Sequence, residues 1–263
     1  AGNVASQVTS SSFTVDTVNP TVTIASTTVS TGTSSNDQSI ALTFTTSETT
    51  SNFTAEDVSV SNGTLSNFAG SGTGYTATFA PSADGATTID VGAGGFSDTA
   101  GNSNDAATQF TWTYDSTAPT ISAIATSAFS WGDILNATED NSDGTVTVTT
   151  NGVENGQTLT LTLNSVNYTA IVSNNSASVT IAAGGLQDLT HGQSYTIAAN
   201  VSDAVGNAAS AVTSSAFTVD TVLPTVANVL STTSNGTYAS GNVSINVVFS
   251  ETVLVTGTPQ LTL

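Results

Sequence analysis

The sequence predicts an all-β protein built from tandem antiparallel β-sandwiches. Three observations carry this prediction. Apolar and polar residues alternate in short runs, clusters of turn-forming residues separate those runs, and a segment recurs at spacings of 99 and 105 residues. No stretch combines a helical period with helix caps, so helices are not expected to contribute to the cores.

The alternating runs are typical of half-buried strands, because successive side chains of a strand point to opposite faces. Clear examples are FTWTY at 110–114, TVTVTT at 145–150 and TLTLTL at 158–163. Between such runs lie turn sequences such as SNG at 61–63 and GSGTG at 70–74. One packed and one solvated face is the usual arrangement of antiparallel sheets.

The internal repeat fixes the domain organisation. Each copy has a Gly-Asn pair, a segment of constant length ending in Asp, and a Pro four residues later. The three copies contain Gly2-Asn3 with Asp16 and Pro20, Gly101-Asn102 with Asp115 and Pro119, and Gly206-Asn207 with Asp220 and Pro224. Two full repeats of this length match the size of single β-sandwiches.

The segment before each Asp is an alternating strand that suits the last strand of a sandwich, and the Pro marks the linker because proline cannot donate to a strand ladder. Boundaries near 18, 117 and 222 follow. We therefore expect a last strand of a truncated repeat at 1–18, whole repeats at 19–117 and 118–222, and the first part of another truncated repeat at 223–263. Such a chain is expected to be a piece of a longer protein.

Composition excludes several functions. The 263 residues include no Lys, Arg, Cys or Met, and the net charge is −19. Nucleic-acid binding requires cationic side chains that release counterions, so it is excluded. Schiff-base chemistry and Lys-based isopeptide bonds are excluded with it, as are disulfides and thiolate metal sites. No membrane-inserting segment is visible.

Several motifs resemble bacterial Ig-like (BIg) repeat domains of giant surface adhesins and biofilm-associated proteins. They are D-x-A-G-N at 98–102, D-x-V-G-N at 203–207, V-D-T-V-x-P at 15–20 and 219–224, and FSETVLVTGTPQLTL at 249–263. The middle repeat resembles a second subtype of the same family. The resemblance implies tandem immunoglobulin-like antiparallel β-sandwiches in an extended array on a bacterial cell surface. The implied partners are neighbouring Ig-like domains of the same chain and other copies of the fibre.

Acidic and amide residues recur around the predicted linkers, where no Lys or Arg can pair with them. Calcium takes oxygen ligands in flexible geometry, so it is the cation that such groups suit. The resemblance adds that related adhesins stiffen their joints with calcium. The candidate metal ligands are Asp16, Glu48, Asp98, Asn102, Asp115, Asp203, Asn207, Asp220 and Glu251. Turn formation explains the same Asp and Asn residues without any metal, because these side chains cap turns through the backbone.

No catalytic constellation stands out, and we expect no enzyme activity. A triad around the lone His191 has no support beyond the abundance of Ser and Asp. Most aromatic residues lie in or beside alternating strands and are expected in the cores. The function predicted is a stalk or spacer of a secreted adhesin or fibre, mediating adhesion or biofilm cohesion. Two alternatives stay open: a self-assembling filament or surface-layer subunit, and a carbohydrate- or ice-binding module.

Overall fold

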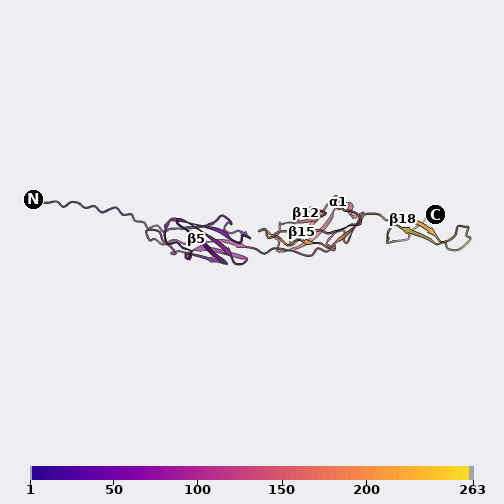
Figure 1. Ribbon diagram of the computed structural model, residues 1–263, viewed down its shortest axis with the longest axis horizontal. Coiled ribbons are helices and arrows are strands. Elements are labelled where there is room, and N and C mark those ends of the chain that lie inside the picture. Colours follow the sequence, from indigo (N-terminus) through magenta and orange to yellow (C-terminus); the bar gives the residue numbers. More distant parts are fainter. Residues whose placement is uncertain (1, 261–263) are drawn as a thin grey trace. The chain divides into compact units, whose positions relative to one another are not determined.

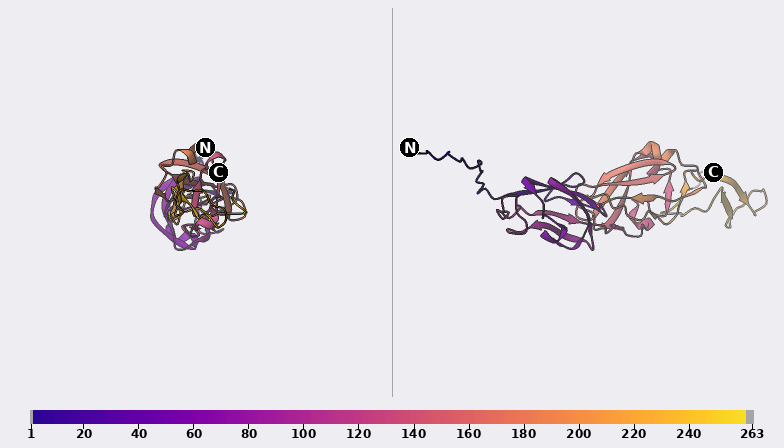
Figure 2. Two further views of the ribbon diagram at one scale, coloured as in Figure 1. Left: turned by 90° about the vertical axis from the view of Figure 1, so that its right-hand side faces the viewer. Right: turned by 60° about the vertical axis from the view of Figure 1, so that its left-hand side comes forward.

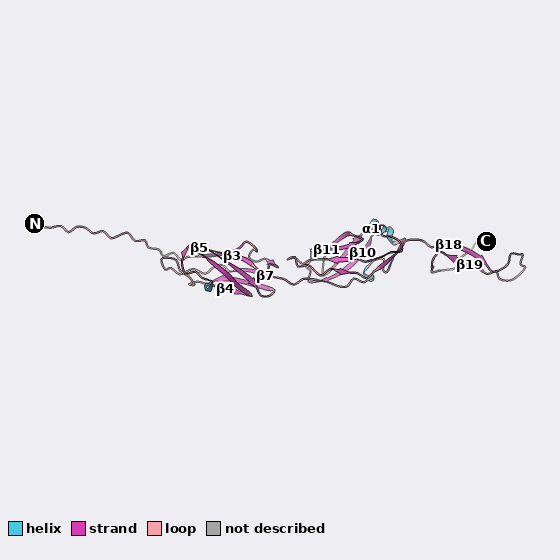
Figure 3. Ribbon diagram, in the orientation of Figure 1, coloured by secondary structure: helices cyan, strands magenta, loops and turns pink. Residues whose placement is uncertain are grey.

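The computed structural model describes residues 2–260, and almost all regular structure in it is β (Figures 1 and 3). The chain forms two compact units. The first comprises residues up to Pro119 together with the loop Ser202–Ala208, and the second comprises Thr120–Val201 and the residues from Ala209 onward. Residue 1 and residues 261–263, which belong to the predicted segments 1–18 and 223–263, lie outside the described residues. The predicted domain boundaries stay predictions.

The first sheet of the first unit has the strand order β1-β3-β5, with β1 at Val22–Ser26, β3 at Ile40–Thr50 and β5 at Gly63–Pro81. Both pairings are antiparallel. In β3 the apolar residues at every second position are buried and the intervening residues are more exposed. This alternation is what the sequence predicted, because one face of the sheet covers a core.

The second sheet of this unit has the order β2-β7-β6-β4. Its strands are β2 at Ser34–Ser35, β4 at Val58–Ser61, β6 at Gly85–Val91 and β7 at Phe110–Tyr114. The short 3₁₀ helix η1, Ala55–Asp57, begins with a capping box between Thr54 and Asp57. The β2–β7 pair is parallel, whereas the other pairs are antiparallel.

The two sheets contribute to one hydrophobic core. Phe44 and Phe79 come from the first sheet, Ile89 and Trp112 come from the second, and all four are 0–1% exposed. Phe44 also packs edge-to-face on Phe53, with ring centroids 5.8 Å apart. Burial of these large side chains is the main source of the unit's stability.

The predicted GSGTG turn is confirmed within β5, where residues 63–69 fold back on residues 74–80. Ser66 donates a hydrogen bond to the carbonyl of Thr78 at 3.4 Å. Gly70 has φ +148°, and a Cβ atom there would lie 2.3 Å from the carbonyl oxygen of Gly74. Glycine is therefore required where the two arms of the hairpin meet.

Besides a two-stranded hairpin, the described part of the second unit contains three sheets, with strand orders β13-β10-β8, β12-β11-β15-β16 and β14-β17-β9. Their strands are β8 at Thr120–Ile121, β9 at Ile134–Asn136, β10 at Gly144–Asn151, β11 at Thr158–Leu163, β12 at Val166–Ile171, β13 at Ser176–Ile181, β14 at Ser194–Tyr195, β15 at Ala198–Asn200, β16 at Val212–Thr213 and β17 at Phe217–Asp220. All pairings are antiparallel except β9–β17. The all-β, antiparallel fold class predicted from the sequence is confirmed.

Short helical turns interrupt the second unit, although the sequence predicted none. They are η2 at Thr126–Ala128, η3 at Glu139–Asn141 and α1 at Ala183–Gln187. Helices this short have no detectable period. Leu186 of α1 is buried in a core that also contains Leu135, Phe217 and Trp131. Trp131, which lies near a predicted loop, is thus a core residue, as expected for most of the aromatic side chains.

The second unit also includes a hairpin of β18, Val226–Ser231, and β19, Ile245–Phe249. Val229 and Leu230 are 47% and 51% exposed. Among the described residues, no further sheet covers this hairpin. It therefore presents apolar side chains that a sandwich would bury.

The structure differs from the sequence prediction in the segment before β1, which contains no strand among residues 2–20 and is drawn as an irregular trace in Figure 2. Phe13 is 85% exposed and Val15 is 73% exposed. The corresponding segments of the later repeats are β7 and β17, which each pair with two other strands. Within the described residues this segment has no such partners, and an alternating sequence forms a strand only where a partner satisfies its backbone.

Candidate metal centre

The loop after β6 holds the most buried carboxylate of the first candidate site. Asp98 is 7% exposed, and its Oδ1 accepts hydrogen bonds from the backbone N–H groups of Gly101 at 2.7 Å and Asn102 at 2.8 Å. Its Oδ2 accepts a hydrogen bond from Asn102 Nδ2 at 2.8 Å. These hydrogen bonds lower the pKa of Asp98, and the bond from the Asn102 side chain contributes most. A charged carboxylate is thereby fixed in the loop between β6 and β7.

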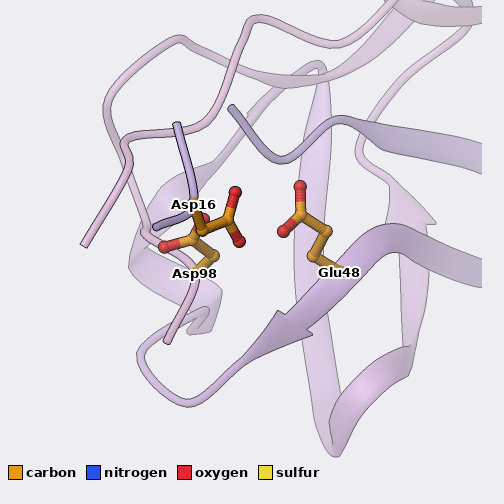
Figure 4. A group of neighbouring side chains, drawn as sticks. All are labelled: Asp16, Glu48 and Asp98. Carbon is orange, nitrogen blue, oxygen red and sulfur yellow. The ribbon is translucent and has the colours of Figure 1, made fainter. Parts of the chain in front are cut away.

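Two further carboxylates converge on Asp98. Ligand atoms of Asp16, Glu48 and Asp98 all lie within 4.8 Å of one another, and Figure 4 shows the three side chains gathered with Glu48 facing the other two. Asn102 Nδ2 donates to the backbone carbonyl of Asp16 at 3.3 Å, which ties the segment before Pro20 to the loop. The structure therefore brings three of the nine predicted residues together.

The electrostatics of this cluster are unfavourable without a cation. Desolvation raises the pKa of Glu48, and the neighbouring charges of Asp16 and Asp98 raise it further. Turn formation explains the hydrogen bonds of Asp98 and Asn102, but it does not explain why Glu48 projects from β3 toward two other acids. A divalent cation with oxygen ligands would relieve their mutual repulsion.

The loop Ser202–Ala208 repeats the same local geometry. Asp203 is 4% exposed, and its Oδ1 accepts from the N–H groups of Val205 at 3.1 Å and Asn207 at 2.7 Å. Asn207 Nδ2 donates to Asp203 Oδ2 at 2.8 Å and to the backbone carbonyl of Asp115 at 3.0 Å. The structure thus brings Asp115, Asp203 and Asn207 together, as Asp16, Asp98 and Asn102 are brought together.

This second cluster lacks a glutamate equivalent to Glu48. Val22 lies two residues after Pro20 and pairs with Thr46. Ile121 lies two residues after Pro119 and pairs with Thr150. The position corresponding to Glu48 is therefore Gly152, which has no side chain to offer. The second cluster carries fewer charged ligands than the first.

The third group contains Asp220, at the end of β17, and Glu251, just after β19. Both line a groove of about 410 Å³ together with Asn136 and Thr138. Asp220 Oδ1 and Glu251 Oε1 are buried and accept no hydrogen bond from the described chain. Buried carboxylate oxygens without hydrogen-bond donors are costly, so they suit a cation or ordered water.

Strand register shows that Glu251 occupies the position of Glu48. Phe249 pairs with Val226 as Thr46 pairs with Val22, and each glutamate follows two residues later. The connection from Ser231 to Ile245 is two residues shorter than the connection from Ser26 to Leu42, and the extra residue at the register shift between Val226 and Asn228 offsets one of them, so the spacing from the preceding proline is one residue shorter. Among the described residues, no counterpart of Asp98 accompanies this third group.

Sequence reasoning missed three residues of the third group, namely Asn136, Thr138 and His191. His191 Nδ1 lies 3.5 Å from Asp220 Oδ1, and both side chains are 46% exposed. Asn136 reaches the group because it pairs with Asp220 in the parallel β9–β17 ladder. That pairing joins segments far apart in the chain, so no sequence signal could have revealed it. The assignment of the nine predicted residues as metal ligands stays a prediction.

Comparison with known proteins places the chain in a family. The model of the bacterial Ig-like domain matches residues 16–114. A bacterial immunoglobulin-like domain from the M. primoryensis ice-binding adhesin is 32% identical over 39% of this chain and 95% of that domain, with a TM-score of 0.28. The chain belongs to the bacterial Ig-like domain family. This assignment, which rests on the sequence matches, confirms the resemblance found in the sequence.

Two longer structures of adhesion proteins are also similar. A Ca²⁺-stabilised adhesin of an Antarctic bacterium is 23% identical over 82% of this chain and 52% of its own, with a TM-score of 0.44. A tetra-tandem repeat from the extending region of a large adhesion protein is 21% identical over 81% of this chain and 52% of its own, with a TM-score of 0.32. The chain thus spans about half the length of these two structures.

Two further findings complete the comparison. No curated protein showed a significant match to the chain. Among residues 2–260, no helix is long and apolar enough to cross a membrane.

Proposed function

We propose that this chain is a spacer segment of a large bacterial surface adhesin or extracellular fibre, in which calcium rigidifies the joints between Ig-like domains. The observation that carries the proposal is the convergence of Asp16, Glu48 and Asp98 at the end of a domain whose family is bacterial Ig-like. A role in adhesion or biofilm cohesion is then mechanical, because the domains hold distant parts of a longer protein apart.

Calcium fits the donor set of the first cluster. The ligands offered are carboxylate oxygens of Asp16, Glu48 and Asp98, with the Asn102 amide oxygen as a further candidate. All are hard oxygen donors, and three negative charges without Lys or Arg suit a doubly charged cation. Extracellular calcium modules commonly bind with dissociation constants of about 0.1–1 mM. Bound calcium would tie the linker carboxylate to two elements of the same domain.

The other two groups support the same role. Asp115 with Asp203 and Asn207 repeats the linker-to-loop contact, and Asp220 with Glu251 repeats the linker-to-strand placement. Each linker Asp is therefore near one or more oxygen ligands from a different element. We propose that the fullest charge set, in the first cluster, binds calcium most tightly.

The proteins to which the chain is similar are consistent with this function. One is described as a Ca²⁺-stabilised adhesin and another as a domain of an ice-binding adhesin. Those properties are stated for those proteins. For this chain, the calcium proposal rests on its own carboxylates, and secretion to a bacterial cell surface with neighbouring Ig-like domains as partners follows from the proposed role.

Calcium titration of the full chain combined with small-angle scattering tests the proposal. We expect the titration to give a measurable heat of calcium binding. We also expect the maximum particle dimension to increase as the linkers become less flexible. Glu48→Gln with Asp203→Asn should weaken both effects, whereas Glu56→Gln, an exposed position on η1, should leave them intact. Absence of calcium binding at about 10 mM, well above the usual range for extracellular modules, would refute the calcium-dependent joint.

A further inference from the structure

Three hydrogen bonds hold the linker after β7 to the turn before β6. Asp84 precedes β6, and its Oδ1 accepts from the backbone N–H of Ser116 at 2.8 Å and from Ser116 Oγ at 2.7 Å. Its Oδ2 accepts a hydrogen bond from Thr117 Oγ1. Both oxygens of this carboxylate are therefore used to bind the first residues of the linker.

The second unit has the same arrangement with different chemistry. His191 Nδ1 accepts a hydrogen bond from the backbone N–H of Thr221 at 3.2 Å. Ser116 and Thr221 occupy equivalent positions, because each lies three residues before the linker proline. The imidazole must carry its proton on Nε2 to accept this bond in the neutral form.

The two acceptors also come from corresponding turns. Asp84 immediately precedes β6, which pairs with the last strand β7, and His191 shortly precedes β14, which pairs with the last strand β17. An acidic and an aromatic residue thus act on the same backbone group of two linkers. The same backbone N–H is bound in both units although the acceptor side chains differ, which indicates that a hydrogen bond at this position helps to hold the linker.

We propose that Asp84 and His191 are positioning residues that fix the direction in which the linker leaves each Ig-like domain. This inference goes beyond the calcium proposal, because it assigns both residues to holding the linker and neither is one of the nine candidate ligands; Asp84 lies outside the three acidic groups, and His191 neighbours Asp220 of the third group. A linker freed at this point would gain rotation about the backbone dihedrals between the last strand and the proline. The Asp84 contact is the stronger, because a carboxylate accepts from the N–H group and two hydroxyl groups.

The pKa of Asp84 supports this geometry. Its bonds to Thr117, followed by those to Ser116, lower the pKa. Linker and turn are therefore more favourably joined when Asp84 is charged, which is its state at neutral pH. No metal is needed for the contact, so it restrains the linker in calcium-free solution as well.

Amide hydrogen exchange of the full chain in EGTA tests the proposal. Asp84→Ala should speed exchange of the Ser116 amide by about tenfold or more, because a bond to a charged acceptor is lost. Asp84→Asn, which retains an amide oxygen as an acceptor, should recover part of the protection. His191→Ala should accelerate exchange at Thr221 but not at Ser116. The control Glu56→Ala should change neither.

A second measurement separates positioning from local protection. NMR relaxation in EGTA should show more independent tumbling of the two units in Asp84→Ala than in the parent chain. Unchanged tumbling, or unchanged exchange at Ser116, would overturn the proposal. Calcium titration of the same variant should give the parent affinity, so failure of the calcium-dependent joint would be recognised separately.

Discussion

Replacing Glu48 by glutamine should have opposite effects on the first unit in the absence and presence of calcium. Without calcium, Glu48 is held near Asp16 and Asp98, and their charges and desolvation raise its pKa. Glutamine keeps the shape but removes one repelling charge, so the variant should unfold at a higher temperature in EGTA. With calcium, the same change removes a ligand, so the stabilisation that calcium provides should shrink.

The size of the calcium effect follows from linkage. A site with a dissociation constant of about 0.1–1 mM stabilises the folded state by about 1.4–2.7 kcal/mol at roughly 10 mM calcium. In a domain of about 100 residues this corresponds to a rise of roughly 6–20 °C in melting temperature. A site weakened about tenfold by loss of one carboxylate would keep only about 0.4–1.4 kcal/mol of that stabilisation.

Differential scanning calorimetry of the full chain and its Glu48→Gln variant, each in EGTA and in calcium, provides the four melting temperatures needed. In EGTA the first unit of the variant should have a higher melting temperature than that of the parent chain, and in calcium this order should reverse. The melting temperature of the second unit should be the same in both proteins. Glu56→Gln controls for the loss of one charge. A variant less stable than the parent in EGTA would refute the idea that the three carboxylates repel one another without a cation.

Three other predictions concern pH and packing. Calcium affinity should fall as pH decreases through the raised pKa of Glu48, and the fall should begin above the ordinary glutamate value of 4.5. Calorimetric titration at several pH values measures it. In EGTA, protonation of Glu48 should instead relieve the repulsion among the three carboxylates. Phe44→Ala should destabilise the first unit by about 3–5 kcal/mol in urea unfolding while the transition of the second unit stays in place, because the two cores are separate. Gly144→Ala should lower the free energy of unfolding by about 1–3 kcal/mol, because a Cβ atom would lie 2.5 Å from the Trp131 ring. Gly184→Ala in α1 has open space around the new Cβ atom and should raise the free energy of unfolding by up to about 1 kcal/mol. Equal effects of the two substitutions in thermal unfolding would contradict this packing.

Local sequence patterns predicted most of the fold. Strands such as β3, β7, β10 and β11 follow from alternation, because the large apolar residues of each strand lie on the one face that covers the core of its unit. The helix α1 was not predicted, because its five residues are too few to show a period. The parallel β9–β17 pair was also beyond sequence reasoning, since it joins segments far apart in the chain.

The candidate sites were predictable in part for the same reason. Repetition placed Asp16, Asp115 and Asp220 at equivalent linker positions, and this needs only the sequence. The pattern did not show that the second cluster has Gly152 where the first has Glu48, because that comparison depends on strand register. It also did not connect Asp84 or His191 with the linkers, because the two residues differ chemically and only the folded turns bring them to the same backbone position.

The sequence by itself determined the all-β class, the repeat length, the family and the absence of any Lys or Arg to neutralise the acids. These properties depend on side-chain type and spacing along the chain. Tertiary structure alone decided that Glu48 converges with Asp16 and Asp98, and that residues 2–20 contain no strand despite their alternation. The physical reason is common to both, because charge repulsion and backbone hydrogen bonding depend on which distant segments meet in space.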